Sequence, residues 1–128
     1  MHKEKFKDSP LVDIFHSGMG YLFEKISQGI HSHSYGDREF GYRNLGMLKD
    51  TYEKFKEALI ERNELNEYTE FDINEYFHAL SRLDGYLSGS DESMEEFDAR
   101  IYLSYLRHEH ERFLAIAKEI DEEYKNQT

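Results

Sequence analysis

Residues 91–124 read DESMEEFDARIYLSYLRHEHERFLAIAKEIDEEY and contain neither glycine nor proline. Mostly apolar side chains recur along this stretch at alternating steps of three and four residues, which is the spacing of one face of an α-helix. The members of this row are Ala99, Leu103, Leu106, His110, Phe113, Ala117, Ile120 and Tyr124. Phe97, Ile101 and Tyr105 add a second apolar flank, so we expect the helix to contact more than one neighbour. The stretch therefore predicts a long C-terminal helix.

Two amphipathic helices are predicted in the first half of the chain. Ser9 followed by Pro10 is typical of a helix N-terminus, because proline at the first helical position gives up no hydrogen bond. The apolar row that follows predicts a helix over 10–29. A second row predicts a helix over 38–64, with lysine and glutamate opposite the apolar face.

Local capping signals place the starts of the last two helices. Asp72 and Glu75 have the spacing of a capping box, in which two side chains bond backbone N–H groups of the first helical turn. They predict a third helix that ends near 88. Ser90 precedes acidic residues and predicts the cap of the last helix, because acids are favourable in a first turn.

Together these segments predict an all-α fold, a four-helix, mostly antiparallel bundle with a long C-terminal helix. We expect a single domain over residues 1–128, with residues 1–9 flexible. At ~1.5 Å per residue the last helix would be about 50 Å long, and the other three roughly 24 to 40 Å. The last helix should project beyond the bundle, or a second copy of the chain should cover its excess as a homodimer.

The composition excludes several classes of function. The 128 residues include 27 acidic and 16 basic side chains, for a formal net charge of -11, so direct binding to nucleic acid is disfavoured. The chain has no cysteine, which excludes disulfides, thiol nucleophiles and cysteine zinc sites. No stretch approaches the ~20 apolar residues of a membrane span, and residues 1–10 lack the apolar core of a secretory signal. We expect a cytoplasmic protein that does not contact membranes.

A metal site is the main enzymatic alternative. Glu75 and His78 form a Glu-x-x-His pair, whose spacing lets two side chains of one helix share a metal, as in di-iron carboxylate bundles. His108 and His110 point about 200° apart on a helix and cannot hold one metal together. We assign no metal site and no cofactor, and keep an alternative in which these four side chains converge on one cavity.

His110 occupies a position where the apolar row predicts leucine. A buried polar side chain needs a hydrogen-bond partner, so we expect a core histidine bonded to a tyrosine or a carboxylate on a facing helix. The alternative is a pH-sensitive or ligand-contacting residue, because burial and nearby acids shift the pKa of histidine.

Glycines within the first two predicted helices need an explanation, because each costs roughly 1 kcal/mol relative to alanine. These glycines are Gly18, Gly20, Gly41 and Gly46. Close packing of the two helices is the favoured interpretation. A cleft bordered by His16, Tyr35 and Arg38, where a ligand approaches the backbone, is the alternative.

Two clusters of acidic residues flank the third helix. The first lies within 61–75 and contains two aromatic residues among its acids. Its candidate partner-binding residues are Glu61, Glu64, Glu67, Tyr68, Glu70, Phe71 and Asp72. The second spans 91–98, and an antiparallel bundle places the two clusters at opposite ends. They are either solvated helix ends or surfaces that attract a basic protein.

These features favour a small, acidic, non-enzymatic interaction protein of the inhibitor, immunity or adaptor type that binds a basic protein partner. Neither a Gly-x-Ser-x-Gly elbow nor a phosphate-binding loop is present in the sequence. One alternative is a metal-dependent or small-ligand enzyme that uses Glu75 and His78 with His108 and His110. Another is a nucleic-acid mimic whose carboxylates imitate phosphates.

Overall fold

Four α-helices and one short 3-10 helix make up the residues that the computed structural model describes, which are 10–15, 18–32 and 34–127. These elements are η1 (Leu11–Ile14), α1 (Met19–His31), α2 (Tyr35–Glu61), α3 (Glu67–Ser88) and α4 (Glu96–Gln127). No strand occurs among the described residues. Within them, no helix combines the length and the apolar character that a membrane crossing requires.

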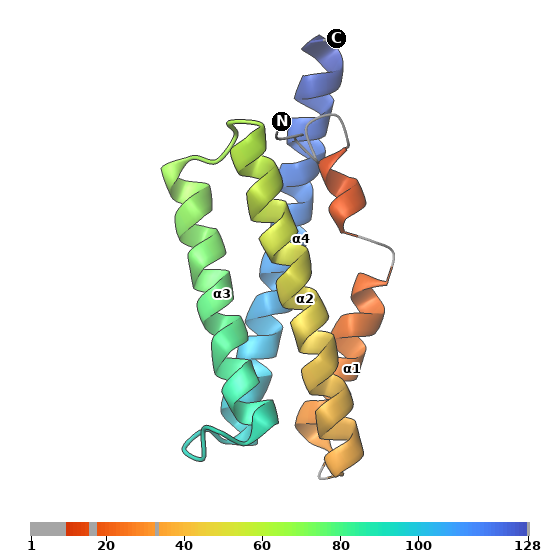
Figure 1. The fold of residues 1–128 in the computed structure, drawn as a ribbon, viewed down its shortest axis with the longest axis vertical. Helices are drawn as coiled ribbons and strands as arrows, with labels where there is room; N and C mark the ends of the chain where they lie inside the picture. The colour runs from red at the N-terminus through yellow and green to blue at the C-terminus, as the bar shows by residue number, and fades with distance from the viewer. Residues whose placement is uncertain (1–9, 16–17, 33, 128) are drawn as a thin grey trace, which may run out of the picture.

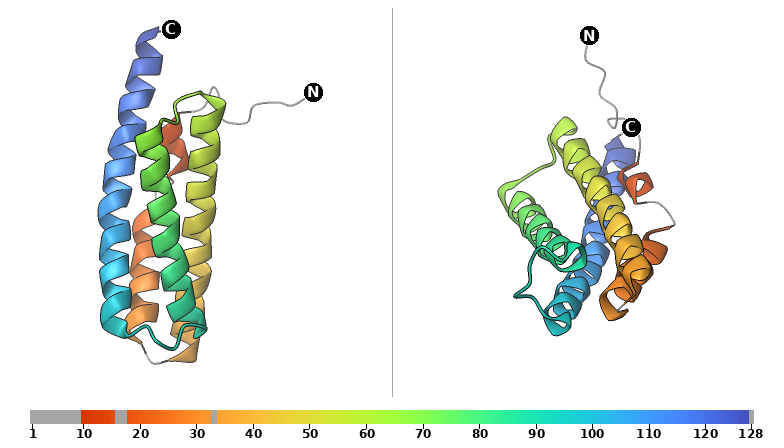
Figure 2. Two further views of the ribbon diagram at one scale, coloured as in Figure 1. Left: turned by 90° about the vertical axis from the view of Figure 1, so that its left-hand side faces the viewer. Right: turned by 60° about the horizontal axis from the view of Figure 1, so that its bottom comes forward.

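The helices form a bundle in which each runs antiparallel to the next (Figure 1). Consecutive helices pack on one another, and α1 also packs on α4, so the four helices surround a common core. The C-terminal end of α4 continues past the other helices (Figure 2). The predicted all-α, four-helix, mostly antiparallel bundle with a long C-terminal helix is therefore confirmed.

The predicted first helix over 10–29 is wrong in one respect, because η1 and α1 are separate elements and α1 begins after Gly18. The carboxylate of Asp121 on α4 accepts hydrogen bonds from the backbone N–H groups of Leu11, at 2.7 Å, and Val12, at 3.1 Å. Side chains can satisfy the first N–H groups of a helix in this way. A long-range contact with α4 thus holds η1, while the predicted cap at Ser9 lies outside the described residues.

The third helix begins earlier than its predicted capping box. Asn66 caps α3, and its side-chain oxygen accepts a hydrogen bond of 2.9 Å from the N–H of Thr69. Just before it, Asn63 has a φ of 58° and ends α2 in a Schellman motif. Asp72 and Glu75 consequently lie inside α3, because Asn63 already ends α2 and Asn66 already starts α3.

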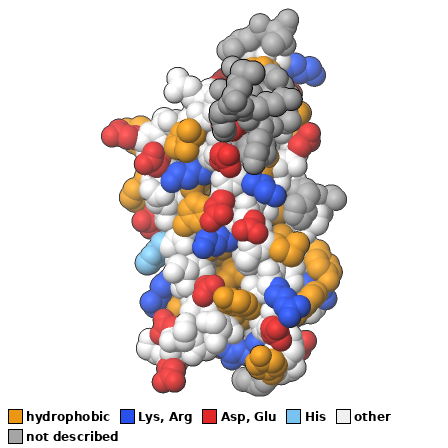
Figure 3. All heavy atoms as spheres, viewed as in Figure 1, with side chains coloured by type: hydrophobic (Ala, Val, Ile, Leu, Met, Phe, Trp, Pro, Cys, Tyr) orange, Lys and Arg blue, Asp and Glu red, His pale blue; other side chains and the backbone are white. Residues whose placement is uncertain are grey.

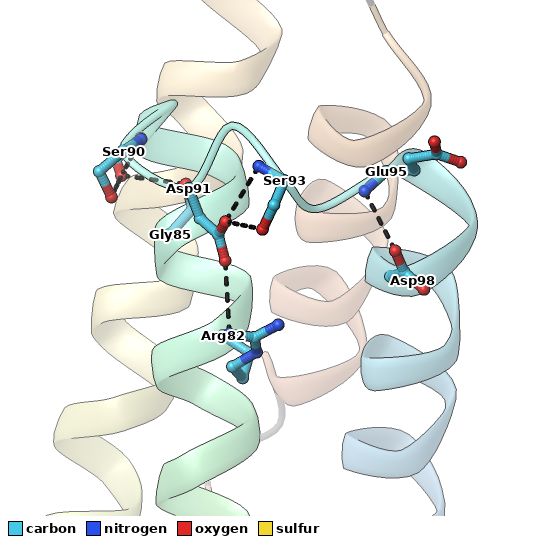
Figure 4. A network of polar contacts seen from close by, with 8 residues as sticks. Arg82, Gly85, Ser90, Asp91, Ser93, Glu95 and Asp98 are labelled. Atoms are coloured by element: carbon cyan, nitrogen blue, oxygen red, sulfur yellow. Dashed lines mark hydrogen bonds and ion pairs between the residues drawn. The ribbon is translucent and has the colours of Figure 1, made fainter.

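The last helix begins at Glu96, so the predicted start at 91 is wrong (Figure 4). Asp91 instead closes a turn. Its carboxylate accepts two hydrogen bonds from Ser93, one of 3.1 Å from the backbone N–H and one of 2.6 Å from the side-chain hydroxyl. Asp98 in the first turn of α4 accepts a hydrogen bond of 3.2 Å from the N–H of Glu95. Asp91 and Asp98 each accept hydrogen bonds from residues two or three positions away, and α4 begins between them.

The row that predicted the last helix is the buried side of α4. Six of its eight members are buried, while Ile120 is half-buried and Tyr124 is 41% exposed. α4 packs against α3, and also against α1 and η1, which confirms that it contacts more than one neighbour. The sequence predicted that the excess length of α4 would project or be covered by a second copy of the chain. η1 of the same chain covers part of it. The homodimer stays a prediction.

Two glycines bring α1 and α2 into backbone contact, and one of them, Gly41, belongs to the predicted set. A Cβ added at Gly41 would lie 3.1 Å from both the Cα of Gly29 and the carbonyl oxygen of Lys25. By contrast, a Cβ at Gly20 or Gly46 would meet nothing within 4 Å. The close approach therefore joins Gly41 to Gly29, and the prediction that Gly20 and Gly46 serve close packing is wrong.

Substitution of these glycines should change stability in opposite directions. Gly46→Ala should raise the free energy of unfolding by about 0.5 to 1 kcal/mol, because alanine is the better helix former and nothing obstructs its Cβ. Gly41→Ala should lower it, because backbone atoms of α1 would have to move away. Urea unfolding followed by circular dichroism measures both, and a stabilising Gly41→Ala would contradict the close approach.

Candidate functional site

The α2–α3 end of the bundle carries exposed acidic and aromatic side chains together. Tyr68 is 82% exposed and Phe71 is 63% exposed, both on the first turns of α3. Exposed carboxylates lie beside them in the sequence, at Glu64 in the connection and at Glu67 and Glu70 in α3. We call these five residues the acidic-aromatic end. Two large exposed aromatic groups beside three exposed acids make this end a candidate interaction surface, because aromatic residues are enriched at protein interfaces.

Two members of the predicted patch do not share this exposure. Glu61 is half-buried at the end of α2. Asp72 is half-buried too, and it pairs with Arg112 of α4 at 2.6 Å. Arg112 also contacts Glu109 at 2.9 Å, so it pairs with one acid on α3 and one acid on its own helix, α4. These bonds, first to Glu109 and then to Asp72, raise the pKa of the Arg112 guanidinium. Asp72 therefore serves an ion pair between helices.

The second acidic cluster lies at the opposite end of the bundle, as predicted (Figures 1 and 4). Its acids are more engaged within the chain. Asp91 lies 3.4 Å from Arg82, Asp98 caps α4, and Glu96 lies 3.9 Å from His31. Hydrogen bonds from Ser93 contribute most to lowering the pKa of Asp91. Phe97 is 68% exposed there, but the local acids chiefly form turns and helix starts.

The four candidate metal ligands do not converge. Glu75 and His78 are exposed and line a hollow of about 230 Å³ with Tyr102 and Tyr105 of α4. His108 is exposed on α4, whereas His110 is buried on a different side of that helix. In the described part of the chain, no three His, Asp or Glu side chains are grouped so that they could hold a metal ion. The metal alternative thus lacks the convergence that it requires.

His110 is a core histidine bonded to a tyrosine, as the sequence predicted. Its Nδ1 lies 2.8 Å from the hydroxyl of Tyr52 on α2, and both side chains are buried. The imidazole also contacts the rings of Phe15 and Phe23, with centroid separations of 5.2 and 5.5 Å. Burial lowers the pKa of His110, and the nearby charge of Glu111 opposes this shift. The neutral imidazole is therefore favoured.

The ring of Tyr52 is part of a larger aromatic core. Its ring stacks on Tyr76 of α3 at a centroid distance of 4.0 Å, and Phe113 of α4 packs edge-on at 5.5 Å. Burial raises the pKa of both tyrosines well above its ordinary value, so both stay protonated. The Tyr76 hydroxyl is buried and has no hydrogen-bond partner among the described residues. Tyr52 belongs to the apolar row that predicts the helix over 38–64, whereas Tyr76 was not predicted as a core residue.

Part of the predicted cleft exists at the N-terminal end of α2. Tyr35 and Arg38 line a hollow of about 510 Å³ together with Tyr42 and Leu87. The Arg38 guanidinium stacks over the ring of Tyr86 at 4.7 Å, so the fold already uses its cation. His16, the third predicted border residue, lies outside the described residues.

Sequence reasoning missed a further hollow on the described surface as a potential site. This groove of about 600 Å³ runs between α2 and α3. Its lining includes Gly46, Lys49, Glu53, Phe77 and Asp84. Gly46 was the available signal, because a glycine in a helix interior that no neighbour requires is unfavourable. The sequence pattern alone could not show that its surroundings are open.

Comparison with known proteins gives no match to a family model, to a curated protein or to a solved structure. The function must therefore be argued from the chain's own surfaces.

The Tyr52–His110 pair should behave as a coupled unit. Tyr52→Phe should lower the free energy of unfolding by about 1 to 3 kcal/mol, because it leaves buried Nδ1 without a partner. Combining it with His110→Leu should recover much of this loss, because both polar groups are then absent. Urea unfolding of the two single variants and the double variant measures the coupling, and additive losses would contradict it.

The same pair predicts a pH dependence. Because the pKa of His110 is lowered by folding, the unfolded chain binds a proton more readily than the native chain. The contribution of the neutral His110 to the free energy of unfolding is complete above pH 6.5, which is the pKa of the imidazole in the unfolded chain. This contribution declines as the pH falls below that value. Between about pH 7 and pH 5, wild type should lose more stability than the double variant. Parallel pH profiles in urea unfolding would contradict this assignment.

Proposed function

We propose that the protein is a non-enzymatic interaction protein that binds a basic protein partner at the acidic-aromatic end. The observation that carries the proposal is the exposure of Tyr68 and Phe71, at 82% and 63%, beside three exposed carboxylates. Aromatic side chains are enriched among the residues that dominate interface energetics. Surrounding acids would favour a partner of opposite charge and accelerate its approach.

The position of this end supports a preformed binding surface. Glu67, Tyr68, Glu70 and Phe71 lie on the first two turns of α3, which Asn66 caps. The Asp72–Arg112 ion pair fixes the same turns to α4. A partner would thus meet side chains that project from an ordered helix, which limits the entropy lost on binding.

The nucleic-acid mimic is less well supported. Imitation of a phosphate backbone requires an array of carboxylates with few interspersed cations. Over the face formed by α2 and α3, acidic and basic side chains alternate, with apolar side chains between them (Figure 3). The acidic-aromatic end adds large rings, which contribute to protein interfaces but do not resemble phosphates.

The proposal predicts that binding depends on both components of the surface. Tyr68→Ala with Phe71→Ala should weaken partner binding by about tenfold or more, because each removes an aromatic anchor. Glu64→Gln, Glu67→Gln and Glu70→Gln together should slow association and reduce its salt dependence. Tagged full-length chain, incubated with cell lysate at low salt, should enrich a basic protein, and purification of that protein allows interferometry with each variant.

A charge-matched variant provides the control. Glu24→Gln, Glu92→Gln and Glu95→Gln also remove three negative charges, but from exposed positions outside the acidic-aromatic end. This variant should bind as wild type does. The proposal fails if the enriched proteins are not basic, or if both triple variants change binding equally.

A further inference from the structure

The groove between α2 and α3 contains a glycine that the fold does not require. Gly46 lies in the interior of the 27-residue helix α2, and a Cβ there would meet nothing within 4 Å. Alanine would favour the helix by about 1 kcal/mol. Gly41 on the same helix shows the contrast, because its missing side chain admits α1. At Gly46 the backbone is instead open to the groove of about 600 Å³.

The floor of the groove is apolar and its rims are charged. Leu45 and Leu80 are buried beneath it, and Phe77 is half-buried on the α3 side. Exposed Lys49 and Glu53 of α2 and Asp84 of α3 stand around this floor. Within the described residues, no ion pair joins any of these three charges to another side chain. They remain available to an external partner.

The register of the two helices orders these charges along the groove. Lys56 of α2 donates a hydrogen bond of 3.4 Å to Asn74 of α3, so these two residues lie near one level of the antiparallel pair. Gly46 lies ten residues before Lys56, and Asp84 lies ten residues after Asn74, so both occupy one level. From that level upward the charges follow the order Asp84, Lys49, Glu53, Lys56. Their signs alternate at steps of three or four residues.

We propose that this groove docks a helix of a partner protein whose charges alternate in the complementary order. A helix presents side chains at the same steps of three and four residues, so a basic, acidic, basic, acidic series can face the four groove charges in turn. The contact spans about three helical turns, or ~15 Å. Close approach at Gly46 lets the backbone of the partner helix, or its small side chains, reach the apolar floor.

The order of charges distinguishes this site from general acidity. A uniformly basic helix would meet Lys49 and Lys56 as like charges, which is unfavourable at contact distance. A uniformly acidic helix would meet Glu53 and Asp84. The groove therefore selects an alternating pattern, whereas the acidic-aromatic end attracts a basic surface. The two sites occupy different parts of the molecule, and neither proposal depends on the other.

The test uses full-length protein and a synthetic helical peptide of about 18 residues, because much shorter helices are marginal in water. One face carries Lys, Glu, Lys and Glu at positions i, i+3, i+7 and i+10, with alanine and leucine between them. A terminal tryptophan reports binding by fluorescence, since the chain itself contains no tryptophan. A control peptide of the same composition has the order Lys, Lys, Glu, Glu, which places two of its four charges against like charges of the groove in either direction.

Gly46→Gln should weaken binding of the alternating peptide by at least about tenfold, because its side chain occupies the groove. Gly20→Gln is the matched control, since a Cβ there also meets nothing within 4 Å and Gly20 lies on α1. Both variants should unfold at or above the wild-type temperature, because glutamine is the better helix former. The Lys, Lys, Glu, Glu peptide should bind wild type at least about tenfold more weakly.

Several results would overturn the proposal. They are no saturable binding of the alternating peptide, equal binding of the two peptides, or wild-type affinity in Gly46→Gln. A concentration-dependent dimer in light scattering that Gly46→Gln abolishes would assign the groove to a second copy of the chain, and would equally overturn it.

Discussion

Tyr52 extends from α2 across the centre of the bundle to His110 on α4, and their hydrogen bond of 2.8 Å is buried. α2 packs on α1 and α3, so this bond links helices that are diagonal in the bundle. An apolar pair could fill the same volume in several registers, but a buried hydroxyl and imidazole lose much of their solvation unless they meet. The bond therefore selects the axial position of α4 against α2. Tyr76 and Phe113, packed on the Tyr52 ring, extend this constraint to α3.

The sequence predicted the architecture because burial is periodic, and it predicted the helix boundaries poorly because ends depend on single contacts. Leu106, His110 and Phe113 are buried, as their shared row required. Asp121 shows the opposite case, since it bonds the N–H groups of residues that precede it by about a hundred positions. No local pattern contains such a contact. Asp72 misled for the same reason, because its spacing to Glu75 fits a cap while its partner, Arg112, lies on another helix.

Of the two candidate surfaces, one could be predicted from the sequence and the other could not. Tyr68 and Phe71 could be identified from the sequence, because aromatic residues within an acidic run have no apolar row to join. Their exposure agrees with that reasoning. Gly46 could be noticed but not interpreted, since a glycine at a close helix contact and a glycine beside an open groove are the same in the sequence. Only the placement of α3 beside α2 separates the two, and it depends on side chains distant in sequence.

The folded chain satisfies most of its costly groups internally, which makes the exceptions informative. His110 has Tyr52, Asp121 has the start of η1, and Arg112 has Asp72 and Glu109. In contrast, exposed aromatic rings at the acidic-aromatic end and an open helix backbone at Gly46 leave free energy of folding unused. Natural proteins tolerate such losses where a surface must recognise something else. Both exceptions lie on ordered helices, so each presents a fixed pattern that selects a partner by charge and shape.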